Sequence, residues 1–64
     1  MFHSVKITAI LLNVRSGPST KYKVINQVKN GEIYTIIEEK SGWGKIAPDN
    51  GWISLKYTEV HGVG

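Results

Sequence analysis

Glycine-containing turns divide this 64-residue chain into short segments, and their spacing favours strands over helices. The turns centre on Gly17, Gly31, Gly42 and Gly51, which lie 14, 11 and 9 residues apart. Turn signals at this kind of spacing are typical of all-β barrels and sandwiches. The stretch that comes nearest to a helical pattern, residues 32–39, is rich in Ile, Tyr and Thr, which favours a strand. We therefore expect an all-β fold.

Alternation of apolar and polar residues predicts the individual strands. Val5 and Ile7, for example, alternate with Lys6 and Thr8. The predicted strands cover residues 4–9, 12–15, 24–29, 33–38, 43–47, 52–54 and 58–60, with one 3₁₀ turn at 55–57. Asn30-Gly31 is the strongest hairpin signal, because both residues tolerate positive φ.

A sheet built from strands this short must curl around itself to bury one face. We therefore predict a small, partly open barrel of about five to seven short strands. The predicted core consists of the inward-facing apolar and aromatic residues Val5, Ile7, Leu12, Val14, Val28, Tyr34, Ile36, Ile46, Ile53 and Tyr57.

The length of the chain allows one domain with a thin core. We expect this domain to cover residues 1–64, with its folded part at about 5–60 and a frayed tail at 61–64. The longest apolar run is four residues, 9–12, so we expect no membrane span. No secretory signal is visible at residues 1–6. We expect a monomeric module excised from a longer protein.

The titratable residues do not suggest an enzyme. Cysteine is absent, which excludes thiolate nucleophiles, thiolate metal ligands and disulfides. Glu38 and Glu39 are adjacent, so on a strand they point to opposite faces and cannot form the carboxylate pair of a glycosidase. His3 and His61 lie near opposite ends, and two histidines without a fixed carboxylate make a poor metal site. We predict no catalytic residue, no metal and no cofactor.

The charge of the chain is mildly positive. Eight Lys and Arg against five Asp and Glu give a formal net charge of +3 and a pI near 9.4. The positive residues are spread along the chain, which is typical of a solvated surface. A positive field also assists attraction to a polyanion, and both nucleic acid and the anionic polymers of a bacterial wall fit that description.

One segment and the order of the motifs after it resemble a known family. Residues 12–19 have the sequence LNVRSGPS. The later matching residues are Tyr22, Val24-Ile25, Lys29-Asn30-Gly31, Gly42-Trp43-Gly44-Lys45-Ile46, Gly51-Trp52-Ile53 and Tyr57. The pattern resembles the bacterial SH3 (SH3b) domain, a small β-barrel appended to enzymes that cut peptidoglycan. The resemblance covers about residues 5–60 and implies an SH3-like barrel.

The LNVRSGPS segment also has a physical interpretation. Asn13 and Arg15 alternate with Leu12 and Val14, so they face away from the core or lie at its rim. An arginine there can hold a neighbouring loop by donating hydrogen bonds to backbone carbonyls. We expect these residues to serve the fold more than the ligand.

Aromatic residues in loops and after turns are the candidate ligand contacts. Tyr22 lies in the polar loop 16–23, where its ring can be either a lid on the barrel or a platform for a ligand. Trp43 and Trp52 each follow a glycine, and each indole offers a flat face for stacking or a plug for the core. We predict a groove between the 16–23 loop and the turns at 40–44 and 48–52 that binds an extended polymer. The predicted contacts are Tyr22, Trp43, Trp52 and Tyr57 for apolar surface, and Lys45, Asp49 and Asn50 for polar contacts.

The resemblance implies a non-catalytic module that binds peptidoglycan or its peptide cross-bridge, with anionic wall polymers as further candidate partners. Such a module holds an attached lytic enzyme (an amidase, an endopeptidase or a lysozyme-like enzyme of an autolysin or phage endolysin) near its insoluble substrate. The expected location is extracellular, at the bacterial cell wall.

Two other classes of function remain open. An SH3-like interaction domain would bind an extended, Pro-rich peptide, but the 16–23 loop has two lysines and no acidic residue to recognise a basic ligand of that kind. A nucleic-acid-binding barrel needs aromatic and basic residues interleaved on an exposed strand face, and Lys45 near Trp43 is the one hint of that pattern. We expect no nucleic-acid partner.

Overall fold

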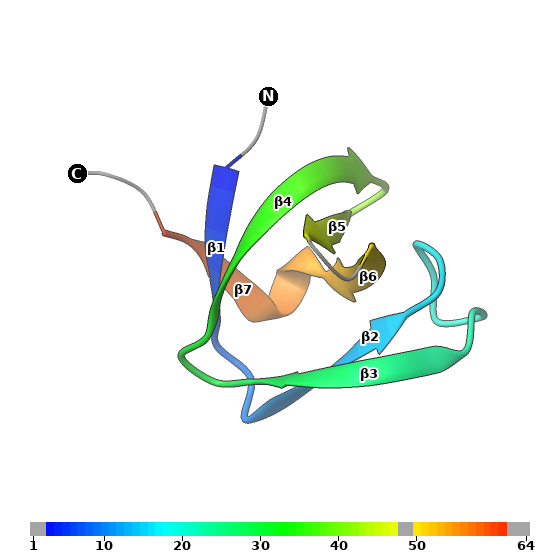
Figure 1. The fold of residues 1–64 in the computed structure, drawn as a ribbon, viewed down its shortest axis with the longest axis horizontal. Helices are drawn as coiled ribbons and strands as arrows, with labels where there is room; N and C mark the ends of the chain where they lie inside the picture. The colour runs from blue at the N-terminus through cyan, green and yellow to red at the C-terminus, as the bar shows by residue number, and fades with distance from the viewer. Residues whose placement is uncertain (1–2, 48–49, 62–64) are drawn as a thin grey trace.

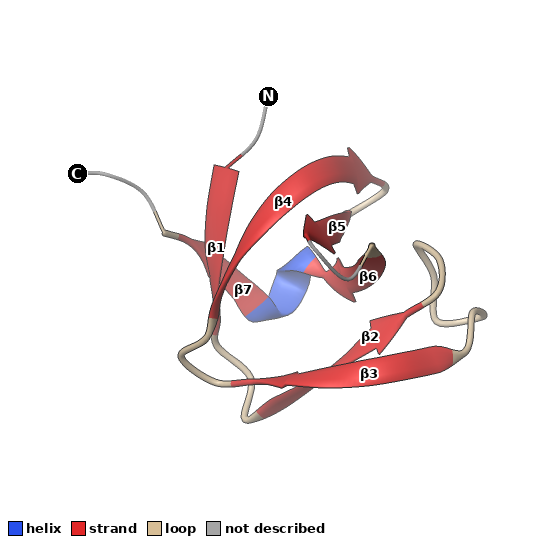
Figure 2. Cartoon of the chain, viewed as in Figure 1, coloured by secondary structure: helices blue, strands red, loops and turns tan. Residues whose placement is uncertain are grey.

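A computed structural model of the protein describes residues 3–47 and 50–61, which contain seven strands and one 3₁₀ turn (Figure 1, Figure 2). In chain order the elements are β1 (His3–Ile7), β2 (Leu11–Arg15), β3 (Val24–Lys29), β4 (Ile33–Lys40), β5 (Trp43–Ala47), β6 (Gly51–Ser54), η1 (Leu55–Tyr57) and β7 (Thr58–Val60). All seven predicted strands and the 3₁₀ turn are present. β1 is shorter than predicted, whereas β2, β4 and β6 extend beyond their predicted bounds.

The strands form one open, antiparallel sheet in the order β3-β2-β6-β5-β4-β1-β7. The sheet is curled, and Figure 1 shows the β2–β3 hairpin crossing beneath the other strands. The edges of the sheet are β3 and β7. The prediction of an all-β, SH3-like fold is therefore confirmed, and none of the described residues forms a helix long enough to cross a membrane.

The core lies on the inner face of the curled sheet. Its buried members are Val5, Ile7, Leu12, Val14, Val28, Ile36, Ile46 and Ile53, all of which were predicted from the alternation of the strands. Tyr34 is only partly buried and packs against this cluster, with its hydroxyl donating to Glu32 Oε1 at 3.1 Å. The prediction that Tyr57 belongs to the core is wrong, because its side chain is 44% exposed.

The Asn30-Gly31 turn does not close a hairpin, so that prediction is also wrong. β3 pairs with β2, whereas β4 pairs with β1 and β5. The turn instead bonds to the connection between β1 and β2, because Gly31 N donates to Ile7 O at 2.8 Å and Asn30 Nδ2 to Thr8 O at 2.9 Å. Gly31 has a φ of 88°, as expected for this glycine, but Asn30 does not adopt a positive φ, so the turn is not the two-residue hairpin turn that was predicted.

The turn at Ser41-Gly42 does close a hairpin, between β4 and β5. The φ angles of these two residues are 51° and 83°, as tight two-residue hairpin turns require, and Lys40 lies opposite Trp43. Leu55 N donates to Gly42 O at 3.0 Å, which fixes the start of η1 beside this turn. The turn thereby places Trp43 next to the segment that follows β6.

The tail is held at its first residue. His61 N donates to Ser4 O at 2.9 Å, which continues the pairing of β7 with β1. The remainder of the predicted frayed tail, residues 62–64, lies outside the described residues.

Candidate functional site

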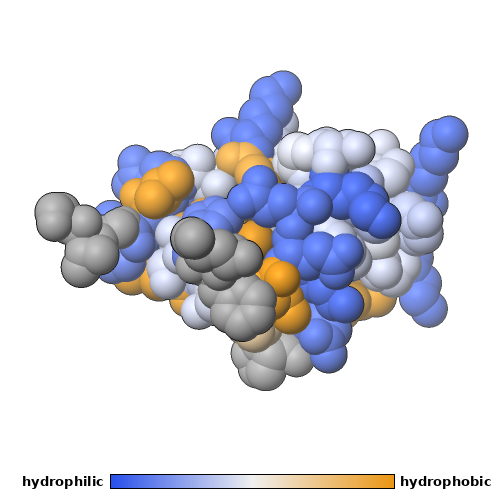
Figure 3. All heavy atoms as spheres, turned by 90° about the horizontal axis from the view of Figure 1, so that it is seen from above, coloured by the Kyte–Doolittle hydropathy of each residue, from blue (hydrophilic) through white to orange (hydrophobic). Residues whose placement is uncertain are grey.

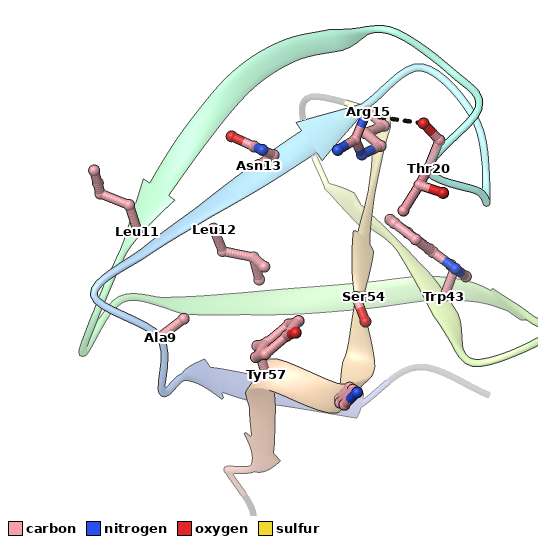
Figure 4. A pocket seen from close by; sticks show the side chains of 10 residues that line it. Ala9, Leu11, Leu12, Asn13, Arg15, Thr20, Trp43, Ser54 and Tyr57 are labelled. Atoms are coloured by element: carbon pink, nitrogen blue, oxygen red, sulfur yellow. Dashed lines mark hydrogen bonds between the residues drawn. The ribbon is translucent and has the colours of Figure 1, made fainter.

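A cleft of about 450 Å³ opens where β2 and β6 separate (Figure 4). The two strands pair at Arg15 and Trp52, and beyond that point β6 leads into η1 while β2 runs away from it. The cleft is lined by Ala9, Leu11, Leu12, Asn13, Arg15, Thr20, Trp43, Ser54, Lys56 and Tyr57. Its walls therefore come from β2 on one side and from β5, β6 and η1 on the other.

The cleft has an apolar base and mixed walls. Leu12 is 7% exposed and Ala9 packs against the core, so these two residues join the cleft to the hydrophobic interior. Leu11, Asn13 and Arg15 alternate along β2 with the buried Leu12 and Val14. These three residues face away from the core, as predicted for Asn13 and Arg15, and they line the cleft. An apolar base with a few polar groups at the edges is the usual composition of a ligand-binding site.

Two aromatic residues from different elements contribute to the walls. Trp43 lies opposite Ser54 across the β5–β6 pair, so both side chains are on the same face of the sheet, and both line the cleft. Tyr57 belongs to η1, and its exposed ring stands next to Ala9 and Leu12 in Figure 4. The cleft therefore presents an indole and a phenol that are each open to a ligand.

Arg15 connects the cleft to the 16–23 loop. Its Nη1 donates to Thr20 O at 3.2 Å and to Tyr22 O at 3.0 Å. Ser16 N donates to Lys23 O at 3.0 Å, which closes the base of the loop. The prediction that this arginine holds the loop through backbone carbonyls is confirmed. The loop in turn brings Thr20 to the edge of the cleft.

The cleft is electropositive. Arg15 and Lys56 line it, and none of the acidic side chains that the structure describes does. Lys56 Nζ lies 5.8 Å from the centroid of the Tyr57 ring, so its charge stays close to the aromatic wall. No group of three or more His, Asp or Glu side chains gathers anywhere in residues 3–47 and 50–61 in a way that could hold a metal ion.

The structure brings two of the predicted contact residues together, Trp43 and Tyr57. Tyr22 lies outside the cleft. Its ring packs on Gly17, where a Cβ atom would come within 2.6 Å of three ring atoms, and it is 48% exposed. Tyr22 is therefore a lid over Gly17 that leaves part of its ring in solvent. Asp49 lies outside the described residues.

Trp52 and its neighbours are arranged differently from the prediction. Trp52 is 7% exposed, which does not suit an open stacking surface, although it stands outside the main core cluster. Its cross-strand neighbours are Arg15 and Lys45. Lys45 Nζ lies 6.0 Å from the centroid of the Trp52 ring, which is already buried. Asn50 has a φ of 58° and precedes β6 at the end opposite Ser54.

Sequence reasoning missed most of the β2 wall as a ligand surface. The available signal was the outward set Leu11, Asn13 and Arg15, which alternates with the buried Leu12 and Val14. That pattern shows which side chains face out, but it does not show that η1 lies across from them. The cleft lies nearer to β2 and η1 than the groove that was predicted between the 16–23 loop and the turns at 40–44 and 48–52.

The face of the molecule drawn in Figure 3 is mostly polar. Figure 3 shows one face of the molecule, on which hydrophobic residues show as separate small areas among hydrophilic ones. Scattered apolar residues of this kind are normal on soluble proteins and need no ligand to explain them. The cleft remains the candidate binding site, because it combines two aromatic side chains with an apolar base.

Comparison with known proteins agrees with this fold. The family model described as the bacterial SH3 domain matches residues 11–59, which is more than half of the chain, and the protein belongs to that family. The resemblance seen in the sequence is thereby confirmed.

One curated relative shows the same similarity over a small part of its length. The chain is 40% identical over 53 residues to the protein named "Putative N-acetylmuramoyl-L-alanine amidase YrvJ" of Bacillus subtilis (strain 168). The aligned segment covers 80% of this chain and 10% of that relative. The chain therefore spans about a tenth of the length of the relative it matches.

Proposed function

We propose that this domain is a non-catalytic module that binds the peptide part of bacterial peptidoglycan and keeps an attached lytic enzyme at the cell wall. The observation that carries the proposal is the open cleft between β2 and η1, with Trp43 and Tyr57 on its walls and Leu12 at its base. Membership of the bacterial SH3 family supports the ligand class.

The lining of the cleft suits an extended peptide. Flat aromatic rings provide apolar contact area at low entropic cost, because each ring has only two rotatable side-chain angles. Asn13, Thr20 and Ser54 add hydrogen-bonding side chains along the edges, where the amide groups of a peptide backbone would lie. The volume of about 450 Å³ is enough for a few residues of such a chain.

A module of this size gains its usefulness from being tethered. Binding through one small cleft is weak. A module that is linked to a lytic enzyme nevertheless raises the effective concentration of that enzyme at the wall, which is its substrate. The similarity to one tenth of a much longer protein named as an amidase supports an attached module. The expected location is outside the cell, at the wall.

The charge of the cleft disfavours the alternative of a Pro-rich, basic peptide ligand. Domains that bind such ligands combine aromatic rings with acidic residues. Here the charged side chains that line the cleft are Arg15 and Lys56, which are both basic. The described lining therefore has no carboxylate that could pair with a basic side chain of such a ligand.

Co-sedimentation of the domain with purified, acid-stripped peptidoglycan tests the proposal. We expect Trp43→Ala and Tyr57→Ala each to weaken binding by about tenfold or more, because truncating a central aromatic contact commonly has that effect. Val60→Ala is the matched control, since Val60 is 73% exposed and lies on the edge strand β7, away from the cleft lining. Circular dichroism checks that each variant is folded. Unchanged binding by folded cleft variants would refute the proposed site, and no binding by the unmutated domain would refute the function.

A further inference from the structure

We propose that the cleft recognises a free carboxylate on its peptide ligand, and that Arg15 is the residue that binds it. This inference rests on the proposed function and narrows its ligand to peptide strands of peptidoglycan that carry an uncoupled carboxyl group.

The geometry of Arg15 leaves one edge of its guanidinium for a ligand. The group has five N–H donors, two of them on Nη1. Both carbonyl contacts to the loop, at Thr20 and Tyr22, come from Nη1. The donors on Nε and Nη2 lie on the adjacent edge of the same plane and have no hydrogen-bond partner among the described residues. That edge has the fork geometry that binds both oxygens of a carboxylate.

The loop contacts also prepare the arginine for binding. An unsupported arginine side chain loses rotational freedom when it captures a ligand, and this loss weakens binding. The contacts at 3.2 and 3.0 Å fix the guanidinium before a ligand arrives. In Figure 4 the guanidinium lies between Asn13 and Thr20, at the end of the cleft where β2 meets β6.

The charge distribution around the cleft favours an anion. Arg15 and Lys56 line the cleft from β2 and η1 respectively, and no acidic residue within 3–47 and 50–61 lines it to compete with a ligand carboxylate. Lys56 is exposed and flexible, so it adds a general attraction rather than a second fixed contact. The peptide would then run from Arg15 across Leu12 towards Tyr57.

A matched pair of peptides tests the inference. The probe is Nα,Nε-diacetyl-Lys-D-Ala-D-Ala, in which the C-terminal carboxylate is the only charge, and its partner is the same peptide with a C-terminal amide. Binding to the 64-residue domain is measured by NMR titration. We expect the amide to bind about tenfold to a hundredfold more weakly, because charge-assisted hydrogen bonds contribute that much.

Variants separate recognition from support of the loop. In Arg15→Lys the positive charge stays but the fork is lost, so the preference for the acid over the amide should fall to about twofold or less. A purely structural role would weaken both peptides equally and leave the preference intact. Lys6→Gln removes one charge on β1, outside the cleft lining, and should leave the preference unchanged.

Three results would overturn the inference. One is equal binding of acid and amide by the unmutated domain. Another is a domain that binds acid-stripped peptidoglycan through Trp43 and Tyr57 but does not bind the acid peptide. The third is binding only to walls that retain their phosphate polymers, which would make those polymers the ligand. The second result would leave the proposed function standing, whereas failure to bind any wall would refute both.

Discussion

The two tryptophans should respond differently to replacement by alanine, because the structure buries one and exposes part of the other. Trp52 is 7% exposed, so nearly all of its side chain, roughly 250 Å² in area, is withdrawn from water. At about 25 cal/mol per Å² this burial is worth at most about 6 kcal/mol. The unfolded chain already hides part of that area, which lowers the expected loss for Trp52→Ala to about 3–5 kcal/mol.

That loss is comparable to the whole stability of the domain. A chain of 64 residues is expected to have a free energy of unfolding of roughly 3–10 kcal/mol. Trp52→Ala should therefore be strongly destabilised, and largely unfolded at 25 °C if the unmutated domain lies at the lower end of that range. Trp43 is partly exposed at the cleft, so Trp43→Ala should lose about 1–2 kcal/mol and stay folded.

Urea denaturation followed by circular dichroism measures both free energies. Trp52→Phe is the conservative control and should recover much of the loss. Since the chain has two tryptophans, each Phe variant also leaves one indole to report on its surroundings. Acrylamide should quench the fluorescence of Trp43 in the Trp52→Phe protein more readily than that of Trp52 in Trp43→Phe. Equal stabilities for the two Ala variants, or equal quenching, would refute the assignment of Trp52 as buried.

Two glycine replacements test the loops. Gly17→Ala places a Cβ within 2.6 Å of the Tyr22 ring, so the half-exposed ring should swing away, with a loss of about 1 kcal/mol and the fold retained; an unfolded variant, or unchanged tyrosine NMR shifts, would contradict this. Gly42→Ala has open space for its Cβ but a φ of 83°, so the loss should be about 1–2 kcal/mol from backbone strain alone. Gly42→Asn should lose less, because asparagine tolerates this conformation, and equal melting temperatures for the Ala and Asn variants would argue against strain as the cause.

Local pattern was sufficient to place the strands and their inward faces. β3 and β5 have the predicted bounds, and every residue of the buried core cluster was expected from two-residue alternation. The role of Arg15 in holding the 16–23 loop also followed from its outward position beside a polar loop. These features depend on residues that are close together in the sequence, so they can be predicted from the sequence alone.

Residue pattern alone is enough to specify an all-β chain, the positions of its strands and the side chains that face inward, because the two-residue repeat of a strand and the turn preferences of glycine are local properties. Which strands become neighbours, in contrast, follows from the complete three-dimensional fold. In the folded sheet β3 and β4 are not neighbours, although the Asn30-Gly31 turn joins them. The same arrangement of strands buries Trp52 and places Tyr57 across from β2, which forms the cleft. Pairing of this kind depends on the packing of the whole curled sheet, so no short stretch of residues specifies it.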